Sequence, residues 1–257
     1  MSGREESMTT VTVLADPPVE GVVLQDLAGG LLDDAEAAGL YEAMLLDVCR
    51  AVEISGGELL VNYRPPEQVP DGVDPEAAVR GPVTDALESP GDARFEVQVG
   101  STFAGRVGNT VTHLLDREEV ATVAAVEPTA ALLTRQLIDS AAMKLRSSGV
   151  VLGPAEGGRV YYAGFGEPID FADSYAVPSV ETIGERAADA GLDVDFLPSA
   201  PVLETRADLR TIVPLLRARN RAGRVVPPRT TAFLDDLGIR VIDDDGEPAV
   251  VRETDRS

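Results

Sequence analysis

The strongest constraint on the fold is an alternation of short strand-like segments with longer helix-like segments. Residues 120–126, VATVAAV, are apolar at all but one position, which is typical of a strand that is buried on both faces. Residues 31–57 instead place apolar side chains three or four positions apart, as an amphipathic helix does. That stripe consists of Tyr41, Leu45, Val48 and Val52. The alternation predicts a three-layer α/β/α fold with a mostly parallel central sheet.

Local patterns place the other elements. Further strands are expected at residues 10–14, 58–63, 94–100 and 192–198, with a strand–turn–strand unit at 150–165. Further helices are expected at 74–88, where Gly81–Pro82 interrupts the pattern, and at 103–116, 129–149, 177–191 and 205–219. A short helix and a hairpin with a DDG turn follow. We therefore expect a main domain at 10–218 and a C-terminal extension at 219–257.

The charge of the chain is strongly negative. Asp and Glu total 44 and Lys and Arg total 22, a net charge of −22, and Lys144 is the one lysine. Such a surface can serve a basic partner or metal ions, or it can be an adaptation to high salt throughout the surface. The acids are spread along the whole chain, which favours adaptation to salt and a halophilic source. The sequence has no basic stripe, so we expect no binding to nucleic acid.

Two rare residue types limit the chemistry. Cys49 is the single cysteine and His113 the single histidine, which excludes cysteine or histidine metal clusters and an internal disulfide. The sequence has no apolar run long enough for a membrane helix and no signal-peptide pattern at its start. We therefore expect a cytoplasmic protein that does not interact with membranes.

Ligands of open parallel sheets bind beyond the carboxyl ends of the strands. We therefore expect a cleft bounded by residues 16–26, 98–106, 127–129 and 153–159. The last of these belongs to GPAEGGRVYYAGF, a glycine-rich turn between two strands. Glycines at a strand end often allow a close approach of backbone and ligand.

Five segments in these regions carry a family resemblance. They are PVEGVVLQDL (18–27), QVGSTFAGRV (98–107), VEPTAAL (126–132), GPAEGGRVYYAG (153–164) and ETRADL (204–209). Together, over Val11 to Leu216, they resemble the MobA-like glycosyltransferase A superfamily, within it an uncharacterised glycosyltransferase-like family related to phospholactate guanylyltransferases. The resemblance implies a nucleotide-diphospho-sugar transferase type of fold at 10–218. It also implies a nucleotide or nucleotide sugar as ligand, with a divalent metal, Mg²⁺ or Mn²⁺.

The resemblance assigns candidate site residues. Arg106 and Arg159 would contact phosphate, and the glycines of the turn would approach the nucleotide: Gly153, Gly157 and Gly158. Glu127 and Glu204 would hold the metal. Each charged residue also has a structural interpretation. Arg106 would pair with one of the many acids, Arg159 would lie on a solvated turn, and Glu127 would cap a helix that begins at Thr129.

The first loop departs from the family pattern. The family places Lys, Thr and Arg where this chain has Leu24, Gln25 and Asp26. A diphosphate would thus meet a negative charge instead of positive ones. Two hypotheses follow, a glycosyl- or nucleotidyl-transferase-like enzyme, or a catalytically inactive relative that serves as a binding or interaction module. The sequence does not set an oligomeric state.

Overall fold

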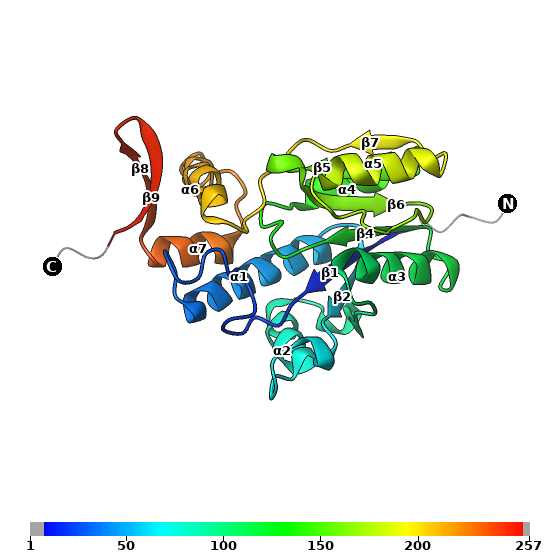
Figure 1. Cartoon of the computed structure of the whole chain (residues 1–257), viewed down its shortest axis with the longest axis horizontal. Coiled ribbons are helices and arrows are strands. Elements are labelled where there is room, and N and C mark those ends of the chain that lie inside the picture. Colours follow the sequence, from blue (N-terminus) through cyan, green and yellow to red (C-terminus); the bar gives the residue numbers. More distant parts are fainter. Residues whose placement is uncertain (1–7, 254–257) are drawn as a thin grey trace.

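The computed structural model describes residues 8–253, and its centre is a seven-stranded sheet of order β3-β2-β1-β4-β6-β5-β7 (Figure 1). β6 is antiparallel to β4 and β5, and all other neighbouring strands are parallel. The strands are β1 (Thr9–Ala15), β2 (Glu58–Tyr63), β3 (Arg94–Val97), β4 (Thr122–Val126), β5 (Val150–Pro154), β6 (Val160–Phe165) and β7 (Val194–Phe196). The predicted fold class is confirmed.

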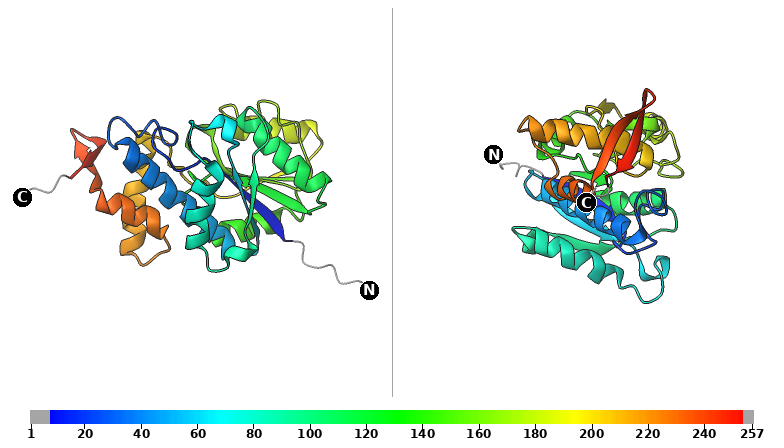
Figure 2. Two further views of the ribbon diagram at one scale, coloured as in Figure 1. Left: turned by 90° about the horizontal axis from the view of Figure 1, so that it is seen from below. Right: turned by 90° about the vertical axis from the view of Figure 1, so that its left-hand side faces the viewer.

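Helices cover both faces of this sheet (Figure 2). They are α1 (Asp34–Glu53), α2 (Pro75–Ala86) and α4 (Arg135–Lys144) on one face and α3 (Phe103–Asp116) and α5 (Ser179–Asp189) on the other. The remaining helices, α6 (Arg206–Arg221) and α7 (Pro228–Asp236), lie at one end of the molecule (Figure 1). Side chains alternate along β1, so that Val11 and Val13 face the helices α1, α2 and α4, whereas Leu14 faces α3 and α5. Each face therefore has its own apolar core.

The helix α1 forms as its sequence predicts. Asp33 is its N-cap, where the Asp33 side chain accepts from the backbone N–H of Glu36 and the Glu36 side chain accepts from that of Asp33. The predicted stripe is buried throughout: Tyr41, Leu45, Val48 and Val52. Leu45, Val48 and Val52 pack in one cluster with β1, and the Tyr41 hydroxyl contacts the chain directly after β1. These contacts place α1 next to the carboxyl end of β1.

One helix interior and two boundaries differ from the predictions. α2 is continuous through Gly81–Pro82, where the pattern predicts an interruption. The predicted helix at 129–149 begins only at Arg135, capped by the Thr134 side chain, because the residues before it cross the sheet edge as buried loop. β3 ends at Val97 rather than at residue 100.

The C-terminal hairpin forms its own two-stranded sheet of β8 (Ile239–Asp244) and β9 (Glu247–Arg252). It lies beyond α6 and α7 at one end of the molecule (Figure 1). Ile239 and Val250 are buried in one cluster with Leu209 of α6, and Arg206 Nη2 donates to the Val250 carbonyl at 2.9 Å. The extension therefore packs on the last predicted helix of the main domain; the boundary at 218/219 stays a prediction. None of the described helices has the length and apolar character to cross a membrane.

We expect the folded state to lose stability in low salt. The turn of the C-terminal hairpin shows why. It carries four exposed acidic residues within five positions, Asp243, Asp244, Asp245 and Glu247. Their mutual repulsion grows as the screening length increases from about 3 Å at 1 M to about 10 Å at 0.1 M salt. Thermal denaturation in molar and in decimolar KCl should differ by at least ~5 °C, equivalent to about 2 kcal/mol for a chain of this size. Equal melting temperatures would contradict adaptation to salt.

Candidate functional site

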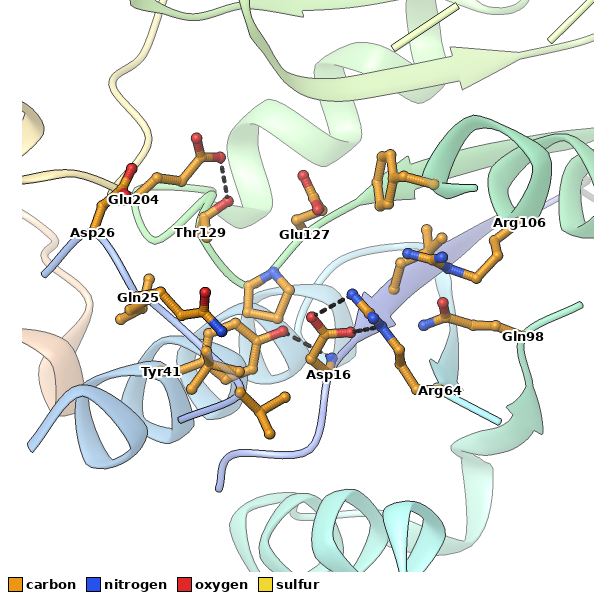
Figure 3. Close-up of a pocket in the computed structure, with 16 residues that line it drawn as sticks. Asp16, Gln25, Asp26, Tyr41, Arg64, Gln98, Arg106, Glu127, Thr129 and Glu204 are labelled. Atoms are coloured by element: carbon orange, nitrogen blue, oxygen red, sulfur yellow. Dashed lines mark hydrogen bonds and ion pairs between the residues drawn. The ribbon is translucent and has the colours of Figure 1, made fainter. Parts of the chain in front are cut away.

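A cavity of about 330 Å³ lies at the carboxyl edge of the parallel half of the sheet (Figure 3). Each of the four parallel strands supplies a side chain just beyond its end: Asp16 after β1, Arg64 after β2, Gln98 after β3 and Glu127 after β4. The remaining walls come from the first loop, α1, α3 and the segment before α6: Leu14, Val22, Val23, Leu24, Gln25, Asp26, Tyr41, Phe103, Arg106, Pro128, Thr129 and Glu204. This is where an open α/β sheet binds its ligands.

Asp16 and Arg64 form an ion pair on the floor of the cavity. Arg64 donates to both carboxylate oxygens of Asp16, with Nη2 at 3.0 Å from Oδ2. The Tyr41 hydroxyl accepts from the backbone N–H of Asp16 at 2.9 Å. Burial, together with the nearby Asp16 carboxylate, holds the pKa of Tyr41 well above its usual range. Since the pair is bidentate, Asp16 neutralises most of the charge of Arg64.

Arg106 is a buried cation without a carboxylate partner among residues 8–253. It belongs to the first turn of α3, is 5% exposed, and extends into the cavity toward Arg64 (Figure 3). Its Nε has no hydrogen-bond partner, and its Nη1 lies 3.5 Å from Gln68 Oε1, the outer limit of a hydrogen bond. Burial lowers the pKa of Arg106, and the charge of Arg64 lowers it further. The cavity therefore holds an incompletely satisfied guanidinium.

Glu127 occupies the centre of the cavity and is partly buried. Burial raises the pKa of this carboxyl to about 8, and the negative charges of Glu204 and Asp16 contribute, against the opposing effect of Arg106 and Arg64. At neutral pH the Glu127 carboxyl is therefore largely protonated, and it can donate a hydrogen bond rather than repel an anion.

Glu204 lines the same cavity, but other side chains hold it. Its Oε1 accepts from the Thr129 hydroxyl at 3.1 Å and its Oε2 from Arg159 Nη1 at 2.8 Å. Arg159 also donates to both carboxylate oxygens of Asp208, at 3.1 and 2.6 Å. Asp208 is in turn the capping-box residue of α6. The predicted phosphate ligand Arg159 is thus committed to two carboxylates and does not line the cavity. The alternative, that Arg159 lies on a solvated turn, does not hold either, because its side chain is half-buried and bound to two carboxylates.

The glycines of the turn do not line the cavity either. A Cβ on Gly153 would lie 2.6 Å from the Tyr161 ring, and one on Gly158 would lie 2.6 Å from Pro178. Gly157 and Gly158 have φ values of +72° and +74°, which favour glycine. Packing and backbone conformation account for these glycines without a ligand, and their assignment to nucleotide binding stays a prediction. Of the four expected loops, three border the cavity, and 153–159 reaches it through the Arg159–Glu204 pair.

The carboxylates as arranged do not fit a divalent metal. Such an ion needs several oxygen ligands in one place. The described part of the chain has no group of three or more His, Cys, Asp or Glu side chains placed to hold one. Asp16 is bound to Arg64 and Glu204 to Arg159, and burial raises the pKa of Glu127 to about 8, so a metal would have to displace its proton. Mg²⁺ or Mn²⁺ would require these pairs to open.

Arg64 lines the cavity, although the sequence does not point to it as a site residue. The loops expected around the cleft are 16–26, 98–106, 127–129 and 153–159, and the loop after β2 is not among them. The sequence does not show which strands are neighbours in the sheet. In the structure β2 pairs in parallel with β1, and Tyr63 lies opposite Ala15. The residue after Tyr63 consequently lies beside Asp16.

Comparison with solved structures agrees with this architecture. A protein of Desulfovibrio desulfuricans G20, provisionally described as a nucleotide-diphospho-sugar transferase, superposes with a TM-score of 0.70 at 22% identity, over 89% of this chain and 94% of the other. The chain has the nucleotide-diphospho-sugar transferase fold. A 4-diphosphocytidyl-2C-methyl-D-erythritol synthase of Anaerococcus prevotii superposes with a TM-score of 0.51 at 12% identity, over 83% and 100% of the two chains. No family model and no curated protein matches this sequence.

Proposed function

We propose that the protein binds a nucleotide or nucleotide sugar in this cavity, as a glycosyl- or nucleotidyl-transferase-like protein whose first loop has lost its phosphate contacts. The observation that carries the proposal is Arg106. A guanidinium that is 95% buried, borders a cavity and has no carboxylate partner among the described residues costs free energy until an anion satisfies it. Nucleotides offer such an anion in the phosphate group.

The charges at the inner end of the cavity support an anionic ligand. Asp16 offsets Arg64, and Glu127 is largely neutral at neutral pH. The charge of Arg106 is then left without compensation. The protonated Glu127 adds a hydrogen-bond donor at the same place, which suits a phosphate or a sugar hydroxyl. A phosphate near Arg106 would therefore replace hydration with charge-assisted hydrogen bonds.

The outer end of the cavity opposes such a ligand. Leu24 and Asp26 of the first loop line it where the resembling family has cations, and Asp26 is exposed. Gln25 turns back to its own loop, where its Nε2 donates to the Gly21 carbonyl at 2.9 Å. We therefore expect weak binding, with one phosphate held at Arg106 and little held by the loop.

A binding protein without transferase activity is the second candidate. It is favoured by the ion pairs Asp16–Arg64 and Glu204–Arg159, which occupy the carboxylates that a metal-dependent transferase would need. Binding of nucleotide without turnover of any nucleotide sugar, with or without added Mg²⁺ or Mn²⁺, would support this candidate.

Calorimetric titration tests the proposal. GTP, CTP and UDP-glucose are titrated into the protein in molar KCl, with EDTA and separately with Mg²⁺ or Mn²⁺. We expect the substitution Arg106→Gln to weaken binding at least ~10-fold, because a hydrogen bond to a charged group contributes about 1.5–3 kcal/mol. The matched control is Arg146→Gln, which removes an exposed arginine outside the cavity. Equal affinity of wild-type and Arg106→Gln proteins, or no binding by wild-type protein, would contradict the proposal.

A further inference from the structure

A second cavity, of about 390 Å³, lies away from the first and shares no lining residue with it. It is enclosed by the C-terminal half of α1, the segment 132–136 at the start of α4, the end of α6 and the connection between α6 and α7. Both cavities border the chain that follows β4, the first at 127–129 and the second at 132–136. We call the second one the apolar cavity.

The walls of the apolar cavity are mainly aliphatic: Ala51, Ile54, Leu132, Leu133, Val225, Val226, Pro227 and Pro228. Two of these apolar side chains are exposed to solvent, Ile54 at 46% and Val225 at 77%. Single exposed apolar residues are ordinary on protein surfaces. Ile54 and Val225, however, both line the apolar cavity, whose volume is that of a small-molecule binding site. The walls therefore favour a ligand with an aliphatic body.

Arginines surround this apolar wall, although the protein carries a net charge of −22. They are Arg50, Arg135 and Arg219. Arg50 pairs with Glu53 and Glu88, and Arg135 with Asp139 at 3.2 Å. Arg219, in the last turn of α6, is half-buried and its side chain has no hydrogen bond or ion pair with another residue of 8–253. Arg219 is thus the cation available to a ligand.

The one carboxylate in the wall does not oppose an anion strongly. The side chain of Asp47 is 2% exposed. Its oxygens accept from the backbone N–H groups of Arg229 and Thr230 and from the Thr230 hydroxyl, at 2.8 to 3.2 Å. Arg229 Nη1 lies 3.6 Å from Asp47 Oδ1. The charge of Asp47 therefore serves the start of α7 rather than the cavity.

We propose that the apolar cavity binds a small amphiphilic anion, with its aliphatic body against Ile54, Leu133 and Val225 and its carboxylate or phosphate head at Arg219. Besides the arginines, the polar lining residues are Asp47, Thr134 and Gln136, and the first two already bind the backbone at the starts of α7 and α4. Few polar groups therefore remain to orient a nucleobase or a sugar, and a fully apolar ligand would leave Arg219 unused. The proposal concerns a second ligand class and does not depend on the nucleotide site.

The test uses decanoate, decyl phosphate, decanol and inorganic phosphate as probes in calorimetric and thermal-shift titrations of the full chain. We expect decanoate and decyl phosphate to bind and to raise the melting temperature, and decanol and inorganic phosphate to bind at least ~10-fold more weakly, since each lacks one of the two interactions. A preference for decyl phosphate over decanoate would assign a phosphate head, and the reverse a carboxylate head.

Two surface substitutions separate the two interactions. Arg219→Gln should weaken decanoate binding roughly 10-fold and leave decanol binding unchanged, whereas Ile54→Gln should weaken both. Arg146→Gln is the control and should leave decanoate binding unchanged, because Arg146 is exposed and lines neither cavity. The proposal is overturned if neither amphiphilic anion binds, if decanol binds as tightly as decanoate, or if Arg219→Gln has no effect. A helix-terminal role of Arg219 alone would lower the melting temperature without any effect on decanoate affinity.

Discussion

Replacing Leu24 with lysine and Asp26 with arginine should strengthen nucleotide binding on the order of 100-fold. Both positions line the nucleotide cavity, and the double substitution turns a net charge of −1 into +2. Two like charges about 4 Å apart repel by about 4 kcal/mol at an effective dielectric near 20 and by about 1 kcal/mol in water. Asp26 is exposed, so its repulsion lies toward the lower value, and the two new attractions supply the remainder.

The measurement is a calorimetric titration of wild-type and double-substituted protein with the same nucleotide, at two salt concentrations. The gain should shrink at high salt, because these side chains are open to solvent. A control is the double substitution Ile242→Lys with Asp243→Arg in the hairpin, which adds the same three positive charges outside the cavity. Weaker binding after the double substitution would mean that the first loop holds its ligand through Asp26 and not despite it.

Glu127→Gln should stabilise the folded protein by about 2 kcal/mol at neutral pH. The pKa of Glu127 is about 8 in the folded protein, whereas its ordinary value is 4.5, so the folded protein retains a proton that the unfolded chain loses above pH 4.5. The wild-type protein therefore loses stability relative to the glutamine variant as the pH rises through that window. The whole difference in pKa corresponds to more than about 2 kcal/mol of unfolding free energy at pH 7. The expected gain is smaller, because Glu127 is partly exposed and water screens its charge.

Thermal denaturation of both proteins at several pH values checks this. The two melting temperatures should coincide near pH 4, where Glu127 is neutral in both states, and differ by roughly 5 °C at pH 7 to 8. The same proton governs ligand binding. Nucleotide affinity in EDTA should fall above about pH 8 in the wild-type protein and stay constant in the variant, because ionised Glu127 repels phosphate. Affinity that rises with pH only when Mg²⁺ or Mn²⁺ is present would instead indicate a metal on Glu127.

The elements themselves follow from short-range patterns. ELLVNY predicts β2 with its observed bounds, Glu58–Tyr63, because β-rich residues between turn signals need only local information. The DDG turn likewise predicts the hairpin of β8 and β9. The family resemblance predicts cations at the positions of Leu24 and Asp26, and both residues line the cavity; the loss of phosphate contacts there stays a prediction.

The partners of the charged side chains were decided by the tertiary structure. Arg159 is 45 residues from Glu204 and 49 from Asp208 in sequence, and with twice as many acids as bases the sequence offers many possible pairings. Only the packing of the β5–β6 turn against the start of α6 brings these three together and draws Arg159 away from the cavity. The same holds for Arg64, which lies beside Asp16 because β1 and β2 are parallel neighbours. Local patterns specify which residues form a strand, whereas the charge of a cavity depends on which distant strand ends meet there.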